Sequence, residues 1–156
     1  MRSRIALGVL AVILFIILGV PFLIPLDDRG FEPAAALADP EGRFITIAGL
    51  ETFVLERGPA DGAPVVLVHG LFGSTFSWRY NQEALAATGF RVIAYDRPGA
   101  GLTEPRADFD FSVANQAAFL AAVLDALDID RARFIAHSAG ANVLAEFALN
   151  DPERIE

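Results

Sequence analysis

The first strong pattern in the chain is a block, residues 5–26, that contains no charged and no polar side chain. A block of this length can cross a hydrocarbon core of about 30 Å as a helix. Two arginines precede it and two aspartates follow it, and this asymmetry predicts a cytoplasmic N-terminus. Residues 1–26 are therefore predicted to be a single-pass transmembrane signal anchor. The rest of the chain would then lie outside the cytoplasm, in the periplasm or at the cell surface if the source is bacterial.

A cleaved signal peptide is the competing interpretation. Its apolar region is normally about 7–15 residues long and ends close to a small-residue cleavage site. The best Ala-x-Ala candidates here, 34–36 and 36–38, lie well past the end of the apolar block. The uncleaved anchor is therefore favoured. Residues 27–41, which are rich in Pro, Ala, Asp and Gly, are interpreted as a tether.

From residue 42 onward the pattern changes to short apolar runs separated by amphipathic stretches. Two strand candidates, Arg43–Ile47 and Thr52–Arg57, fit a hairpin near the edge of a sheet. Three later runs are apolar without alternation, which indicates strands covered on both faces, as in parallel sheets. These runs are Pro64–His69, Arg91–Tyr95 and Arg133–His137.

Helical patterns separate these runs. They cover Trp78–Ala87, Val113–Leu127 and Ala139–Leu149, and Ser112 is a plausible N-cap of the second. Alternating strands and helices predict an α/β fold with a mainly parallel sheet and right-handed crossovers. Residues 42–156 are therefore predicted to form one α/β unit.

Composition excludes several kinds of chemistry. The chain has no cysteine and no lysine, so a disulfide, a thiolate metal site, a Schiff base and a phosphate-loop lysine are all ruled out. The formal net charge of −8 argues against a nucleic-acid partner. We expect neither a metal nor an organic cofactor. There are two histidines, His69 and His137.

The sharpest motif runs from Ala136 to Gly140, with Ser138 at its centre, after an apolar run and before a helical one. A nucleophile elbow needs this context, because a tight strand-to-helix turn raises the serine hydroxyl above the sheet edge. Small residues two positions before and after the serine let the strand and helix approach. The usual first residue is Gly, and Ala136 is one methyl larger. The plainer interpretation is a helix-capping serine.

A second motif, His69-Gly70-Leu71-Phe72-Gly73-Ser74, follows the first long run. Here the chain resembles the α/β-hydrolase superfamily of the serine-nucleophile type. The resemblance implies an oxyanion hole made by the backbone N–H groups of Leu71 and Ala139, with Phe72 the second choice for the first donor. It also implies supporting roles for His69, Gly70, His137 and Gly140. The alternative is a plain glycine loop.

A third motif, Asp96-Arg97-Pro98-Gly99-Ala100-Gly101, looks like the D-x-x-G-x-G turn of the same superfamily. The resemblance implies structural roles for Asp96, Gly99 and Gly101. A dinucleotide loop is excluded, because position 104 is Glu rather than Gly or Ala. The tail 149–155 resembles the segment that leads into the sixth strand of this fold, so the resemblance covers residue 43 to the end.

The catalytic triad of this fold runs in the order Ser, acid, His. Both histidines precede Ser138 in the sequence, and the resemblance places neither in a triad. The general base, and with it the acid, is therefore expected beyond Glu156. The sequence predicts the amino-terminal half of an incomplete three-layer α/β-hydrolase sandwich.

The predicted function of the whole protein is a membrane-anchored serine hydrolase acting on a carboxylic ester, with an amide or thioester as second choices. In this superfamily a serine elbow argues against epoxide hydrolase and haloalkane dehalogenase chemistry, which the resemblance associates with Asp at that position. Perhydrolase and carbon–carbon hydrolase chemistry stay open, since both reuse the serine. The alternative from another class is a truncated, non-catalytic, membrane-tethered remnant or binding module.

Overall fold

The computed structural model describes residues 2–23 and 32–156. The chain divides into two compact units, Met1–Pro33 and Ala34–Glu156. The first unit contains helix α1 (Arg2–Gly19) and the 3-10 helix η1 (Val20–Leu23). The second unit contains the remaining elements, beginning with the short helix α2 (Ala34–Leu37).

The transmembrane helix predicted over residues 5–26 is not supported. Within the described residues, none of the helices is both long and apolar enough to cross a membrane. The predicted contact with a lipid bilayer is likewise unsupported. Residues 24–31, which hold the end of the predicted span and the start of the tether, lie outside the described residues.

The predicted hairpin is confirmed. Strands β1 (Gly42–Ile47) and β2 (Leu50–Arg57) pair antiparallel, with Ile47 opposite Leu50. The two linking residues, Ala48 and Gly49, have φ angles of 47° and 78°. Two successive positive φ angles are typical of a type I′ turn, whose twist matches that of the paired strands.

The sheet has five strands in the order β1-β2-β4-β3-β5. Strands β3 (Pro64–Val68), β4 (Arg91–Tyr95) and β5 (Arg133–Ala136) run parallel to one another, as predicted. Strand β2 is antiparallel to both β1 and β4, so the sheet is mixed rather than mainly parallel. The correction arises because the hairpin strand β2 joins the parallel strands directly, and a sequence pattern does not reveal that neighbour.

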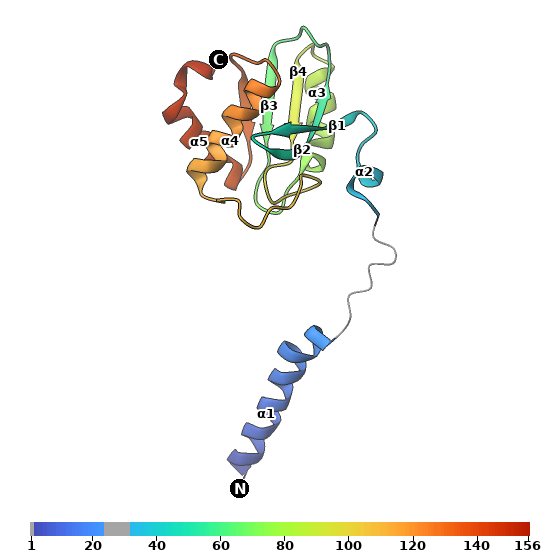
Figure 1. Ribbon diagram of the computed structural model, residues 1–156, viewed down its shortest axis with the longest axis vertical. Helices are drawn as coiled ribbons and strands as arrows, with labels where there is room; N and C mark the ends of the chain where they lie inside the picture. The colour runs from blue at the N-terminus through green and yellow to red at the C-terminus, as the bar shows by residue number, and fades with distance from the viewer. Residues whose placement is uncertain (1, 24–31) are drawn as a thin grey trace. The chain divides into compact units, whose positions relative to one another are not determined.

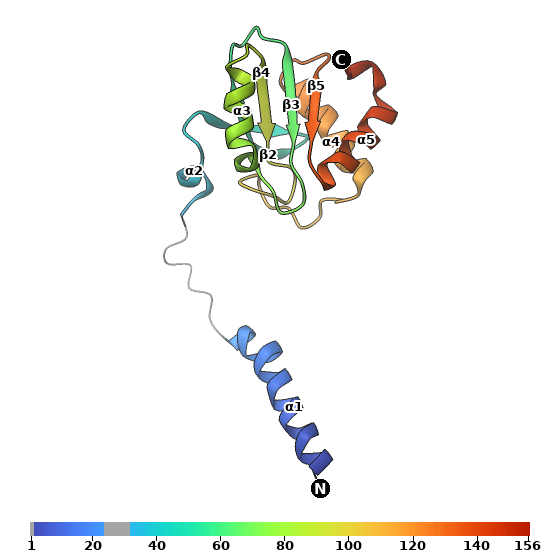
Figure 2. The same ribbon diagram turned by 180° about the vertical axis from the view of Figure 1, so that it is seen from behind.

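Helices cover both faces of the sheet. Figures 1 and 2 show α3 (Arg79–Ala86) on one face and α4 (Val113–Ala126) with α5 (Ala139–Asn150) on the other. Along β3, Val65 and Leu67 pack in the cluster with Trp78, while Val66 and Val68 pack in the cluster with α4 and α5. Burial on both faces explains why these strands are apolar without alternation.

The helix boundaries agree with their sequence signals. The Ser112 side chain accepts a hydrogen bond from the N–H of Asn115 at 3.3 Å and so caps α4 as predicted. A 3-10 turn, η2 (Thr75–Trp78), precedes α3. After α5 the short helix η3 (Pro152–Arg154) places Ile155 in a parallel bridge with Ala132. The tail thus begins to extend the sheet beside β5, as the resemblance implied.

Candidate active site

Ser138 lies at the turn between β5 and α5. Its φ and ψ angles are 53° and −125°, a region that residues with a side chain rarely occupy. Strain of this kind costs about 1–3 kcal/mol and concentrates at functional sites. Ser138 is exposed, and its side chain makes no capping hydrogen bond to α5. The turn is held instead by its backbone, through Gly140 N–H to His137 O at 2.9 Å. The Ser138 hydroxyl is therefore not used as a helix cap.

Two glycines allow the surrounding segments to approach this turn closely. A Cβ at Gly140 would meet the carbonyl oxygens of Val68 and His69, at the end of β3. A Cβ at Gly70 would lie 3.0 Å from the Ser138 Cβ and 3.1 Å from Nδ1 of His137. The fold thus brings the His69-Gly70 loop and the serine turn into contact, although 68 positions separate Gly70 from Ser138.

The loop after β3 has a defined peptide orientation. The Gly70 carbonyl oxygen accepts from the Gly73 N–H at 3.2 Å and from Nη2 of Arg97 at 3.3 Å, and it lies 2.8 Å from Nδ1 of His69. In a planar trans peptide, the C=O of one residue and the N–H of the next point in opposite directions. The Leu71 N–H therefore points away from the side of the loop where His69 and Arg97 hold this carbonyl.

The second predicted donor is at the start of a helix. Ala139 is the first residue of α5, and the first N–H groups of a helix have no partner within it. Leu71 and Phe72 are 68% and 98% exposed, and Phe72 has a φ of 56°. The side chains of the loop therefore point toward solvent. The oxyanion-hole roles of Leu71 and Ala139 stay predictions.

His69 is fully buried, and both of its ring nitrogens are engaged. Nε2 accepts from the Arg97 N–H at 3.0 Å, so the ring proton is assigned to Nδ1, which donates to the Gly70 carbonyl. Burial lowers the pKa of His69; the Gly70 hydrogen bond opposes this shift and the Arg97 charge adds to it. A neutral ring with no free nitrogen is unsuited to act as a general base. His137 is exposed.

The Asp96 loop is held by its own carboxylate. Oδ1 accepts from the Thr75 N–H at 2.6 Å and Oδ2 from the Leu102 N–H at 2.7 Å. A Cβ at Gly101, whose φ is 56°, would overlap this carboxylate. At Gly99, with a φ of 78°, a Cβ would lie 2.5 Å from the Phe111 ring. Both carboxylate oxygens of Asp96 are thus used by the backbone.

Sequence reasoning missed Thr103, which is buried in the same loop. Its hydroxyl donates to the Asp96 carbonyl at 2.6 Å and accepts from the Phe53 N–H at 3.1 Å. It therefore ties this loop to β2. The only sequence signal was its position just after the glycine turn, which does not specify a partner 50 positions away.

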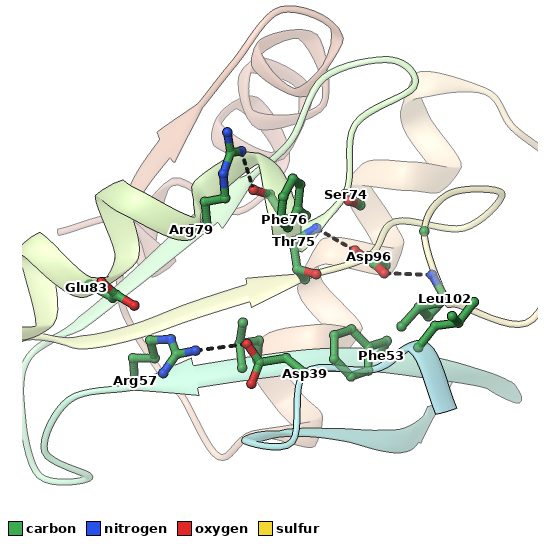
Figure 3. A pocket seen from close by; sticks show the side chains of 13 residues that line it. Asp39, Phe53, Arg57, Ser74, Thr75, Phe76, Arg79, Glu83, Asp96 and Leu102 are labelled. Atoms are coloured by element: carbon green, nitrogen blue, oxygen red, sulfur yellow. Dashed lines mark hydrogen bonds and ion pairs between the residues drawn. The ribbon is translucent and has the colours of Figure 1, made fainter. Parts of the chain in front are cut away.

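A hollow of about 430 Å³ lies away from the serine turn, between β2, η2 with α3, and the α2 segment (Figure 3). Ser138 does not line it. Figure 3 shows Arg57 directed toward Asp39, with which it forms an ion pair of 2.9 Å, and Arg57 also pairs with Glu41. Arg79 donates to the Phe76 carbonyl. Since these charged groups already have partners, we assign no chemistry to this hollow.

Other hollows adjoin residues 69–74, the oxyanion loop that the resemblance predicts. One of about 550 Å³ lies between the loop, α3 and β5. Another of about 510 Å³ lies between the loop, the Asp96 turn and the start of α4. Across residues 2–23 and 32–156, no cluster of three or more His, Asp or Glu is placed to hold a metal ion.

The sheet order, the helices on both faces and the strained serine turn together define an α/β protein of hydrolase type. The sequence model of the alpha/beta hydrolase fold family matches residues 63–156. The chain therefore belongs to the alpha/beta hydrolase fold family, which confirms the predicted resemblance.

Individual relatives are named as hydrolases of different kinds. A putative carbamate hydrolase RutD of Variovorax paradoxus is 38% identical over 99 residues, covering 64% of this chain and 37% of that protein. A 2-hydroxy-6-oxo-2,4-heptadienoate hydrolase of Pseudomonas putida is 34% identical and covers 73% of this chain and 41% of its own length. The chain thus spans about two fifths of the length of these curated relatives.

The solved structures agree with this assignment. The epoxide hydrolase VrEH1 from Vigna radiata superposes with a TM-score of 0.70 at 30% identity, covering 74% of this chain and 37% of that one. Hydrolases are therefore similar to this chain both in sequence and in fold.

Proposed function

We propose that this chain is part of a serine hydrolase that acts on a carboxylic ester, with an amide or thioester as second choices. One observation carries the proposal: Ser138 is exposed, has a φ of 53°, and stands between a strand and a helix with its hydroxyl free of a capping bond. Serine at this position supports acyl transfer rather than epoxide opening.

In the proposed mechanism the Ser138 hydroxyl oxygen attacks the ester carbonyl carbon and loses its proton to a general base. The N–H groups of Leu71 and Ala139 donate to the oxyanion, and such preorganised donors stabilise the charge that develops there. The alcohol leaves with a proton, and water then releases the acid from the acyl-enzyme. The orientation of the Gly70 carbonyl supports the part given to Leu71.

The general base is proposed to lie outside this chain, together with the acid that orients it. His69 is neutral and both its nitrogens are bonded, so it lacks the free nitrogen that a base requires. Without a base, a serine hydroxyl is a weak nucleophile at neutral pH. Reading the coding sequence past codon 156 tests this directly. A frame that continues to a late Asp and His supports the enzyme, and an immediate stop codon supports the non-catalytic alternative.

Labelling tests the nucleophile. In the intact protein, a fluorophosphonate probe should modify Ser138, and short p-nitrophenyl esters should be hydrolysed. Ser138→Ala should abolish labelling and lower kcat by roughly 10³-fold or more. Ser77→Ala, a matched change at another exposed serine, should retain both. Esterase activity that survives Ser138→Ala would refute the assignment.

A further inference from the structure

The Asp96 turn contains a buried guanidinium group that has no counter-charge among residues 2–23 and 32–156. Arg97 is 6% exposed, and its Nη2 donates to the Gly70 carbonyl. In the described part of the chain no carboxylate forms an ion pair with it, and its Nε has no hydrogen-bond acceptor. The neighbouring Asp96 carboxylate is already occupied by two backbone N–H groups.

Arg97 carries a positive charge in this buried position. An arginine stays protonated in proteins even where burial lowers its pKa, as it does here. A buried charge is strongly destabilising unless it is paired and hydrogen-bonded. Arg97 would therefore be stabilised by an anionic hydrogen-bond acceptor, which the described residues do not supply.

The place where this anion would sit is the hollow of about 510 Å³ beside the oxyanion loop. Arg97 lines it together with Leu71 and Phe72 of that loop. Gln116 also lines it, and its buried Oε1 has no donor among the described residues. The remaining walls include Pro98 and the Phe111 ring. The hollow thus combines a cationic end with apolar sides.

We propose that this hollow binds a carboxylate on the substrate, with Arg97 as its counter-ion. The ligand would carry the carboxylate at one end and the scissile carbonyl, a short apolar chain away, at the oxyanion loop. This proposal rests on the proposed function for the second end of the ligand, but the carboxylate contact itself does not require Ser138.

A merely structural Arg97 would hold the Gly70 carbonyl and do nothing else. The two roles predict different behaviour. Loss of a structural contact weakens binding of charged and neutral ligands alike, whereas loss of a counter-ion weakens only the charged one. A pair of ligands that differ in charge, and otherwise only by one methyl group, therefore separates the roles.

The test is isothermal titration calorimetry on the full 156-residue chain. The two probes are monomethyl glutarate, which carries a carboxylate, and dimethyl glutarate, which does not. The wild type should bind the monoester roughly 10- to 100-fold more tightly, as expected for a charge-assisted hydrogen bond in a buried site. Arg97→Met should lose this preference, and Arg97→Lys should keep part of it.

Controls make each outcome decisive. Arg131→Met, at an exposed arginine before β5, should leave the preference unchanged. The proposal is overturned if the wild type binds the two probes with equal affinity. This holds even if the reason is that a carboxylate of the protein itself already pairs with Arg97. A preference that persists in Arg97→Met overturns it as well. Should Arg97→Met fail to fold, the wild-type comparison and Arg97→Lys still decide. Failed fluorophosphonate labelling of wild-type Ser138 would refute the proposed function without changing the outcome of this binding comparison.

Discussion

The buried His69 ring should make the unfolding free energy of this chain depend on pH below about 6.5. Protonation of Nε2 would remove the hydrogen bond from the Arg97 N–H, now 3.0 Å long, and place a charge in a buried position. Burial is the largest cause that lowers the pKa of His69 below its ordinary value of 6.5. In the unfolded chain no such burial applies, so the ring there titrates near 6.5.

The direction of the effect follows from proton binding. Below pH 6.5 the unfolded state binds a proton at His69 that the folded state does not, so stability falls as the pH falls. The stabilising contribution is complete above about pH 6.5, and it is lost as the pH drops from there toward the lower pKa of the folded state. One proton limits the slope to about 1.4 kcal/mol per pH unit.

The perturbation is His69→Gln, which removes the titrating ring, and His137→Gln is the matched change at the exposed histidine. Between pH 7.5 and 5.5 the wild type and His137→Gln should lose more stability than His69→Gln, by at most about 1.4 kcal/mol or a few °C in Tm. Urea unfolding followed by the fluorescence of the buried Trp78 measures the difference at each pH. An identical pH dependence in His69→Gln and the wild type would refute the reasoning.

Two further substitutions test the packing of the site, with unfolding free energies from urea denaturation as the readout. Gly140→Val should destabilise the chain by about 1–3 kcal/mol, because the valine side chain would push α5 away from the end of β3. The control Ala145→Val, on the exposed side of α5, should change the stability by no more than about 0.5 kcal/mol. Equal costs for the two substitutions would contradict the close approach of α5 to β3. Thr103→Val should cost about 1–3 kcal/mol of stability, because it leaves the Phe53 N–H without an acceptor, while Thr103→Ser should keep most of the stability. An unchanged unfolding free energy in Thr103→Val would show that this hydrogen bond contributes nothing.

Local features of the chain could be read from the sequence because they depend on near neighbours. The apolar runs at β3, β4 and β5 predicted strands buried on both faces, and the hydrophobic clusters bear this out. The cap at Ser112 and the Ala48-Gly49 turn likewise involve residues a few positions apart. The order strand, serine turn, helix around Ser138 was also visible, since one short segment contains all of it.

Features that depend on which segments become neighbours needed the tertiary structure. Hydropathy over residues 5–26 predicted a membrane span, but within the described residues no helix is both long and apolar enough to cross a membrane. Strand patterns do not specify partners, so the antiparallel pairing of β2 with β4 was not foreseen.

The same limit applies at the candidate site. The motifs placed Gly70 and Ser138 in the same superfamily pattern. The three polar contacts on the Gly70 carbonyl, and the burial of Arg97 without a carboxylate partner among the described residues, emerge only once β3 and β4 lie side by side. The sequence determined which local turns and caps could form, because those are set by φ and ψ preferences and by hydrogen bonds within a few residues. The tertiary structure decided which buried polar groups found partners, because their partners are brought near by the burial of distant apolar surfaces.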